Sequence, residues 1–146
     1  MKIEFVMRFP EGMPKSTSQE KGERIRYMVR GGKKVPYIQH YTKDEVESAA
    51  RKFIIQLKQH RPLRPLEGPL KLYIVFYFDV KNKKLWGQYK ETRPDLDNSV
   101  KLLSDQMTRC RYWKDDSQVV DLHVIKRYAE EASIYVRLSD VTEEET

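Results

Sequence analysis

The strongest limit on the fold is an apolar run in the middle of the chain, at residues 70–78. If this segment is a β-strand, its side chains alternate between the two faces of a sheet. One face then carries Leu70, Leu72, Ile74 and Phe76, and the other carries Tyr73, Val75 and Tyr77. A strand that is apolar on both faces is typical of the interior of a sheet with a layer packed on each side. We therefore expect a central strand that is covered on both faces.

Strands and helices are predicted on both sides of this segment. Alternating apolar residues predict strands at 2–9, 24–30, 35–38, 118–126 and 133–138, with Gly31-Gly32 as a hairpin turn. Thr42 and Glu45 form a capping box ahead of a first helix. The apolar face of this helix consists of Val46, Ala49, Ala50, Phe53, Ile54 and Leu57.

A second helix, from Asp97 to Arg109, is predicted by apolar residues at helical spacing: Leu96, Val100, Leu103 and Met107. Helices and strands are mixed without the regular alternation of a doubly wound fold. The fold class we expect is therefore α+β, a mixed β-sheet with two main helices packed on it. One domain would span residues 1–140, and the acidic residues 141–146 would form a frayed tail.

The balance of charge favours a polyanionic partner. The 146 residues include 28 Lys and Arg against 22 Asp and Glu, a net charge of +6, and three of the acids lie in the tail. Pairing Lys and Arg with phosphates releases condensed counterions, which drives binding to nucleic acids. Charge alone does not separate a DNA-binding protein from one that is merely basic.

The single cysteine, Cys110, excludes an intrachain disulfide and a cysteine-cluster zinc site. This favours a reducing, cytoplasmic setting. Residues 72–78 form the longest apolar run, which is far too short to cross a bilayer, and charged residues interrupt any signal-peptide core at the N-terminus. We therefore expect a protein that is neither secreted nor embedded in a membrane.

Two basic segments are candidate DNA-contacting surfaces. Residues 15–34 hold seven basic and two acidic residues, and residues 81–93 hold five basic residues and one acid beside Trp86 and Tyr89. Aromatic rings among cations suit base stacking together with phosphate pairing. The alternatives are a solvated strand face and an ordinary surface loop with a packed tryptophan. The candidate residues are Lys15, Lys21, Arg24, Arg26, Arg30, Lys33, Lys34, Lys81, Lys83, Lys84, Trp86 and Arg93.

Carboxylates gather at the start of the second helix and again ahead of a later strand. Asp95 and Asp97 can converge only if Asp95 lies in extended chain before the helix begins, because residues two apart on a helix point about 200° from each other. Lys101 lies one turn after Asp97 on the same helical face. Asp115 and Asp116 follow at the start of a strand. If that strand lies beside the helix, three or four acids and one lysine share a pocket.

Such a pocket could bind Mg²⁺, because this ion prefers hard oxygen ligands and keeps several waters. A bound metal polarises a scissile phosphate and lowers the pKa of water, and an ammonium group stabilises the developing negative charge. Structural alternatives remain open. Asp97 would then be a helix N-cap, Asp97, Lys101 and Asp105 an ion-pair ladder, and the Asp115-Asp116 pair a turn.

Two motifs together resemble the signature of the RusA family of Holliday junction resolvases. They are Asp95-Leu96-Asp97-Asn98 with Lys101, and Trp113-Lys114-Asp115-Asp116-Ser117-Gln118-Val119. The likeness extends in order over most of the chain, including Lys126-Arg127. Two of the departures from the family pattern are Ser99, where an apolar residue is usual, and Arg109-Cys110-Arg111, which replaces a glycine-containing turn.

The resemblance implies a homodimeric, Mg²⁺-dependent endonuclease of DNA recombination and repair, of a kind often encoded by phages and prophages, which nicks four-way junctions symmetrically. Mn²⁺ is the expected substitute metal. By the same resemblance, Asp95, Asp97 and Asp116 would bind the metal, Lys101 would be the catalytic lysine, and Asp115 is a further candidate ligand. The apolar strip of the second helix could serve a dimer interface as well as the core. The alternatives are a DNA-binding module without cleavage and a nuclease of this fold that acts on flaps or forks.

Overall fold

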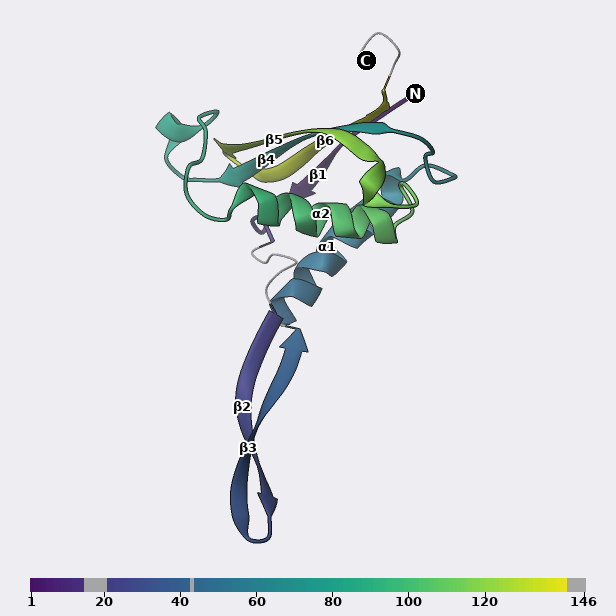
Figure 1. Ribbon diagram of the computed structural model, residues 1–146. Helices are drawn as coiled ribbons and strands as arrows, with labels where there is room; N and C mark the ends of the chain where they lie inside the picture. Colours follow the sequence, from purple (N-terminus) through teal and green to yellow (C-terminus); the bar gives the residue numbers. More distant parts are fainter. Residues whose placement is uncertain (15–20, 43, 142–146) are drawn as a thin grey trace.

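In the computed structural model, a four-stranded sheet lies over two helices, and a long hairpin projects away from them (Figure 1). The structure describes residues 1–14, 21–42 and 44–141, and for 21–24, 38–42 and 44–46 it describes the backbone alone. The strands are β1 (Lys2–Phe9), β2 (Lys21–Arg30), β3 (Lys33–Thr42), β4 (Leu70–Asp79), β5 (Val119–Ala129) and β6 (Ala132–Asp140). The helices are α1 (Asp44–His60), α2 (Leu96–Arg109) and the short 3₁₀ turns η1 (Lys83–Leu85) and η2 (Asp116–Gln118).

The main sheet is mixed, with strand order β1-β6-β4-β5. β6 pairs antiparallel with both β1 and β4, whereas β5 pairs parallel with β4. The parallel pair needs a long connection, and α2 lies in it. This confirms the α+β class with a mixed sheet and two main helices. The side chains of the predicted capping box, Thr42 and Glu45, lie outside the described residues. So does the acidic tail after Val141.

The core lies between the sheet and the two helices. Leu70, Ile74 and Phe76 of β4 are at most 2% exposed. They pack in one cluster with side chains of α1 and α2, including Phe53, Leu57, Leu103 and Met107. Both helices present the apolar faces that their spacing predicts. The N-terminal strand contributes Phe5, Met7 and Phe9 to this cluster, at alternate positions as predicted.

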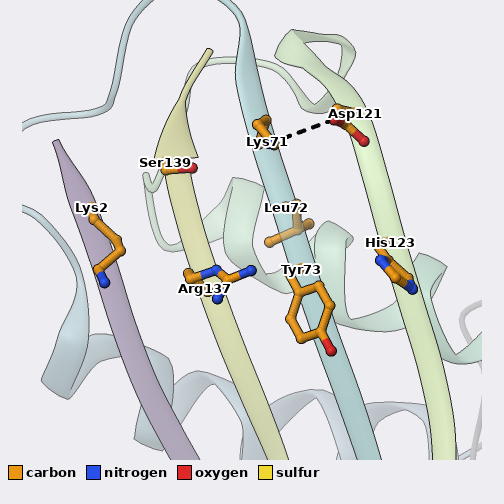
Figure 2. Close-up of a pocket in the computed structure, with 8 residues that line it drawn as sticks. All are labelled: Lys2, Lys71, Leu72, Tyr73, Asp121, His123, Arg137 and Ser139. Carbon is orange, nitrogen blue, oxygen red and sulfur yellow. Dashed lines mark ion pairs between the residues drawn. The ribbon is translucent and has the colours of Figure 1, made fainter. Parts of the chain in front are cut away.

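Within residues 1–14, 21–42 and 44–141, no helix or second sheet packs on the opposite face of the main sheet (Figure 1), so the prediction that β4 is covered on both sides is wrong. Tyr73 and Tyr77 are partly exposed there. Neighbouring side chains shelter Tyr73, since the Arg137 guanidinium lies 4.7 Å from its ring centroid and the His123 ring meets it edge-on at 4.9 Å. This open face holds a hollow of about 400 Å³ (Figure 2). Tyrosine tolerates such a position because its hydroxyl remains in water while its ring packs.

The α2 strip belongs to the core of a single copy. Leu103 and Met107 are fully buried, and Leu96 and Val100 are partly buried against the same cluster. The strip therefore serves the core, as predicted, and Leu96 and Val100 are its members that remain partly accessible to a second copy. Leu102 is also buried, which makes the apolar face of α2 wider than the spacing alone indicates.

The turn after α2 explains one departure from the family pattern. Arg111 has φ 66°, in the left-handed region where glycine is usual. Burial of the neighbouring Tyr112 and Trp113, both 0% exposed, holds the chain in this conformation.

Among the residues that the structure describes, no helix is long and apolar enough to cross a membrane.

Candidate active site

Asp95 is the N-cap residue of α2 and lies in extended chain, with φ −66° and ψ 142°. The extended backbone that convergence of Asp95 and Asp97 requires is therefore present, although Asp97 is not the N-cap residue. The Asp95 side chain does not cap the helix, so its carboxylate is left free of the role that such a position usually has. Both Asp95 and Asp97 are exposed, and neither carboxylate makes a hydrogen bond or ion pair within the described part of the chain.

The approach to Asp95 is fixed by two side chains that sequence reasoning did not single out. The Lys126 ammonium donates to the carbonyl oxygens of Thr92 and Pro94, both at 2.8 Å. The Ser99 hydroxyl and its backbone N–H both donate to the Asp95 carbonyl at 3.1 Å. Ser99, which stands where the family usually has an apolar residue, is thus buried and forms hydrogen bonds to the Asp95 backbone. Lys126 carried a signal only as part of the family resemblance.

Lys101 is exposed and pairs with Asp105, one turn along α2, at 3.0 Å. This hydrogen bond and the charge of Asp105 raise the pKa of Lys101, and the charge of Asp116 raises it further. The ion-pair alternative therefore holds for Lys101 and Asp105, whereas no ion pair joins Asp97 to Lys101 in the described chain. Lys101 and Asp116, which lie on separate elements, are close enough to interact electrostatically.

The neighbouring acids Asp115 and Asp116 have different surroundings. The Asp115 carboxylate accepts a hydrogen bond from the Ser117 backbone N–H at 2.9 Å and caps η2. This hydrogen bond is the largest of the causes that lower the pKa of Asp115. Asp116 is the first residue of η2 and is exposed. The turn interpretation thus fits Asp115, and Asp116 is the acid of the pair that is available for chemistry.

Gln118 holds this segment in place through four hydrogen bonds. Its side-chain oxygen accepts from the backbone N–H groups of Lys114 and Asp115 at 2.9 and 3.2 Å. Its side-chain nitrogen donates to the carbonyls of Leu66 and Gly68 at 3.0 and 3.1 Å. One amide therefore ties the Asp115-Asp116 turn to a segment about 50 residues earlier. The spacing of Asp115 and Gln118 is that of a capping box, which accounts for the bond to the Asp115 N–H, whereas no local pattern marks the bonds to Leu66 and Gly68.

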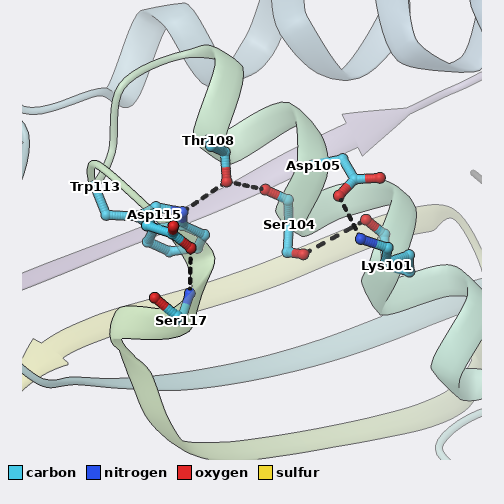
Figure 3. A network of polar contacts seen from close by, with 7 residues as sticks. All are labelled: Lys101, Ser104, Asp105, Thr108, Trp113, Asp115 and Ser117. Carbon is cyan, nitrogen blue, oxygen red and sulfur yellow. Dashed lines mark hydrogen bonds and ion pairs between the residues drawn. The ribbon is translucent and has the colours of Figure 1, made fainter.

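Buried aromatic side chains anchor the same segment to the helices. The Trp113 indole N–H donates to the Thr108 hydroxyl at 2.7 Å, and that hydroxyl donates to the Ser104 carbonyl at 3.0 Å (Figure 3). The Tyr112 hydroxyl donates to the Leu57 carbonyl at 2.6 Å, and burial raises the pKa of Tyr112. These bonds attach the turn that carries Asp116 to both α1 and α2.

The site residues form a loose arrangement in this structure. Within the described ranges, no three acidic, histidine or cysteine side chains come together closely enough to hold a metal ion. The predicted pocket shared by three or four acids is therefore not formed in a single copy of the chain. The donor chemistry still fits a hard divalent cation, since Asp95, Asp97 and Asp116 offer exposed carboxylate oxygens.

The loop at 81–93 packs along the free edge of β5. Backbone hydrogen bonds join Gly87 and Gln88 to Tyr128, and Lys90 to Lys126. The Trp86 indole N–H donates to the Val80 carbonyl at 2.8 Å, and the ring is partly buried. These contacts agree with the packed-tryptophan alternative. Tyr89 is the open aromatic of this loop, 69% exposed, with the Arg127 guanidinium 4.3 Å from its ring centroid.

The candidate DNA-contacting cations lie in two places. Arg26, Arg30, Lys33 and Lys34 are exposed on the β2–β3 hairpin, and Lys81, Lys83, Lys84 and Arg93 are exposed around the loop. Lys15 lies outside the described residues, as do the side chains of Lys21 and Arg24.

Comparison with known proteins gives one family. The family model of Endodeoxyribonuclease RusA matches residues 11–139. The chain is 37% identical over 143 residues to the crossover junction endodeoxyribonuclease rusA of Lactococcus phage r1t, covering 97% of this chain and 100% of that protein. It is 34% identical over 132 residues to the uncharacterized protein YqaN of Bacillus subtilis (strain 168), covering 82% of this chain and 88% of that protein. The chain therefore belongs to the RusA family of endodeoxyribonucleases, enzymes that hydrolyse phosphodiester bonds of DNA.

Proposed function

We propose that this chain resolves Holliday junctions by paired, symmetric nicks that depend on a divalent cation. The observation that carries the proposal is that Asp95, Asp97 and Asp116 are exposed acids in a protein of a nuclease family. Within the described chain, the carboxylates of Asp95 and Asp97 make no hydrogen bond or ion pair. The junction substrate is supported by the name of the phage relative, which matches nearly the full chain.

Asp95, Asp97 and Asp116 would hold the cation, Mg²⁺ with Mn²⁺ as a substitute. When bound, such an ion polarises the scissile phosphate and lowers the pKa of a water ligand. The protein's part is to present the three carboxylates to the phosphate, and to do so on segments that Lys126 and Gln118 fix by hydrogen bonds to the backbone. We leave Asp115 out of the ligand set because its carboxylate caps η2.

Lys101 would supply a positive charge for the extra negative charge that develops on the reacting phosphate. Its present partner is Asp105, in an exposed pair of the kind that contributes little to stability. The ammonium can therefore exchange Asp105 for a phosphate oxygen at small cost. We assign Lys101 as catalytic, and Asp105 as the group that holds its side chain along α2 until DNA binds.

Two nicks across a two-fold symmetric junction require two active sites related by a two-fold axis, so we propose a homodimer. The basic residues of the β2–β3 hairpin and of the loop at 81–93 would bind phosphates of the junction arms. A cytoplasmic location, where such DNA occurs, accords with the buried free thiol of Cys110.

The test compares two neighbouring acids that receive the same change. Asp116→Asn removes a proposed metal ligand, whereas Asp115→Asn keeps an oxygen that can cap η2. We expect nicking of a four-way junction in Mg²⁺ to fall by orders of magnitude in Asp116→Asn and by less than about tenfold in Asp115→Asn. Junction binding without metal should hold or tighten in Asp116→Asn, because one repulsive charge is removed.

The same assay includes duplex, flap, replication-fork and single-stranded DNA, with Mg²⁺, Mn²⁺ and no metal. Preference for the junction supports the proposal. Junction binding without any nicking would assign the chain as a DNA-binding module, and a preference for flaps or forks would assign it as another kind of structure-specific nuclease. An Asp116→Asn protein that nicks at close to the parent rate would rule out the proposed site.

A further inference from the structure

The β2–β3 hairpin leaves large apolar side chains open to solvent. Ile25, Tyr27 and Val29 are 67%, 64% and 72% exposed. The hairpin extends away from the sheet and the helices, so neither layer covers it (Figure 1). A two-stranded hairpin without a further layer is at best marginally stable in water. Such a surface indicates a partner that covers it.

The two faces of the hairpin differ in character. Ile25, Tyr27 and Val29 lie on one face, where Pro36 stands opposite Tyr27 and Lys34 opposite Val29. The other face carries Arg26 opposite Tyr37, Met28 opposite Val35, and Arg30 opposite Lys33. No acidic residue occurs from 25 to 37. The hairpin is therefore a ribbon with one largely apolar face and a second face on which cations and apolar side chains are mixed.

Charge decides between the partners that could cover this ribbon. Packing the apolar faces of two hairpins together would place Lys34 of each copy in the contact without an acid to pair with it, and would leave the cations of the other face without counter-charges. DNA supplies phosphates for the cations and base edges for the apolar face. The major groove, about 12 Å wide, admits a two-stranded β-ribbon. Each strand has 10 residues, and at about 3.3 Å per residue it spans roughly one turn of duplex.

We infer that the β2–β3 hairpin enters the major groove of one arm of the DNA substrate, with its apolar face against the base edges. Tyr27 and Val29 contact apolar groups there, such as thymine methyls, and Arg30 and Lys33 reach phosphates at the rim of the groove. This inference rests on the proposed function for the kind of DNA, and on the hairpin alone for the mode of binding. By this inference, the uncharged side chains of Tyr27 and Val29 contribute part of the free energy of DNA binding.

Two double variants separate the two contributions. Tyr27→Thr with Val29→Thr removes apolar contact and places threonine, a β-branched residue that suits a strand, at both positions. Arg30→Gln with Lys33→Gln removes two charges. A matched control, Leu63→Thr, removes an equally open apolar side chain, 105% exposed, away from the hairpin. Circular dichroism and thermal melting show whether each variant keeps the parent fold.

Affinity for a four-way junction is measured without metal over a range of salt concentrations. The apolar variant should bind at least about tenfold more weakly with an unchanged slope of log affinity against log salt, since its charges still release the same counterions. The charge variant should bind more weakly, with a slope smaller by about 0.9 for each phosphate that it no longer neutralises. The control should match the parent.

Methylation of guanine N7 by dimethyl sulfate reports the groove directly, because N7 lies in the major groove. The parent protein should protect N7 positions over about one turn of a junction arm, and the apolar variant should lose this protection at concentrations where it is fully bound. Absence of protection by the parent protein would overturn the inference. An apolar variant that binds DNA like the parent would also overturn it. So would an apolar variant whose mass by light scattering differs from that of the parent, because a second copy of the chain would then be the partner that covers this face. All these measurements omit metal and cleavage, so a failure to nick junctions would count against the proposed function alone.

Discussion

Replacing Gln118 by glutamate tests how the Asp116 turn is held. The change keeps the size of the side chain and the oxygen that accepts from Lys114 and Asp115. It replaces the nitrogen that donates to the Leu66 and Gly68 carbonyls by an oxygen. Two hydrogen bonds are removed, and a negative charge then faces two carbonyl oxygens.

The expected destabilisation follows from these hydrogen bonds. Each ordinary hydrogen bond contributes about 1 kcal/mol net, and leaving the partner unsatisfied costs more. Because Gln118 is only partly buried, we expect Gln118→Glu to lower the free energy of unfolding by about 2–3 kcal/mol at pH 8. For a domain of this size, that corresponds to a melting temperature lower by about 6–9 °C. Nicking should also fall, since the turn carries Asp116.

The pH dependence gives a sharper test than the size of the destabilisation. Glutamic acid ordinarily has a pKa of about 4.3. In the variant the two N–H groups can bond the carboxyl oxygen in either protonation state, whereas the two facing carbonyls favour only the protonated form, so we expect the pKa of the introduced carboxyl group to be raised in the folded protein. A protonated carboxyl can donate as the amide does. With the folded pKa raised, the variant regains stability relative to the parent as the pH falls through that pKa, and loses it as the pH rises.

Urea unfolding of parent and variant at pH 4, 6 and 8 measures this effect. The difference should be smallest at pH 4. Gln88→Glu serves as a control, because the Gln88 side chain makes one exposed hydrogen bond, to the Lys84 carbonyl at 2.8 Å. A difference between parent and Gln118→Glu that stays below about 1 kcal/mol, or that does not change with pH, would refute the role assigned to Gln118.

Three further predictions concern the metal, the basic loop and the approach to the site. Mg²⁺ should raise the melting temperature of the parent and raise that of Asp95→Asn less, because a ligand that binds only the folded state stabilises it; equal shifts by differential scanning fluorimetry would count against a metal at Asp95. Lys83→Ala with Lys84→Ala should weaken binding to all DNA substrates and reduce the salt slope by about 0.9 for each phosphate left without its lysine; an unchanged slope would mean that this loop does not touch DNA. Lys126→Met should lower the nicking rate more than junction affinity, because it frees the Thr92 and Pro94 carbonyls ahead of Asp95, and an effect confined to affinity would place Lys126 among the residues that contact DNA.

Periodicity alone predicts most of the fold, because alternate positions and helical spacing follow from which face meets the core. It accounts for β1, for both helices and for the mixed sheet. It could not show that one face of β4 is open, since Tyr73 and Tyr77 suit a covered face and a half-exposed one equally well. The number of layers depends on where the other elements pack, and here both helices lie on the same side (Figure 1).

The site was predictable to the extent that local geometry determines it. The predicted start of the second helix left Asp95 in the chain ahead of it, and the backbone angles confirm that Asp95 is extended. The family resemblance favoured Asp116 over Asp115, but the local pattern could not give a physical reason, since both are exposed acids in the same turn. Only the fold shows that the Asp115 carboxylate turns back to the Ser117 N–H.

The residues that position the acids could not be found from sequence, and the reason is physical. The side chains of Asp95 and Asp97 have no partner within the described residues, so their placement depends on the backbone that carries them. Lys126 holds the backbone ahead of Asp95 by bonding Pro94, which is 32 residues away in sequence. Gln118 holds the Asp116 turn by bonding Leu66, which is 52 residues away. Periodic patterns report contacts within one element and say nothing of bonds between elements so far apart. Gln118 and Lys126 both stand in stretches that resemble the family, but the sequence does not say what they do, because their bonds to backbone carbonyls exist only once distant segments have packed together.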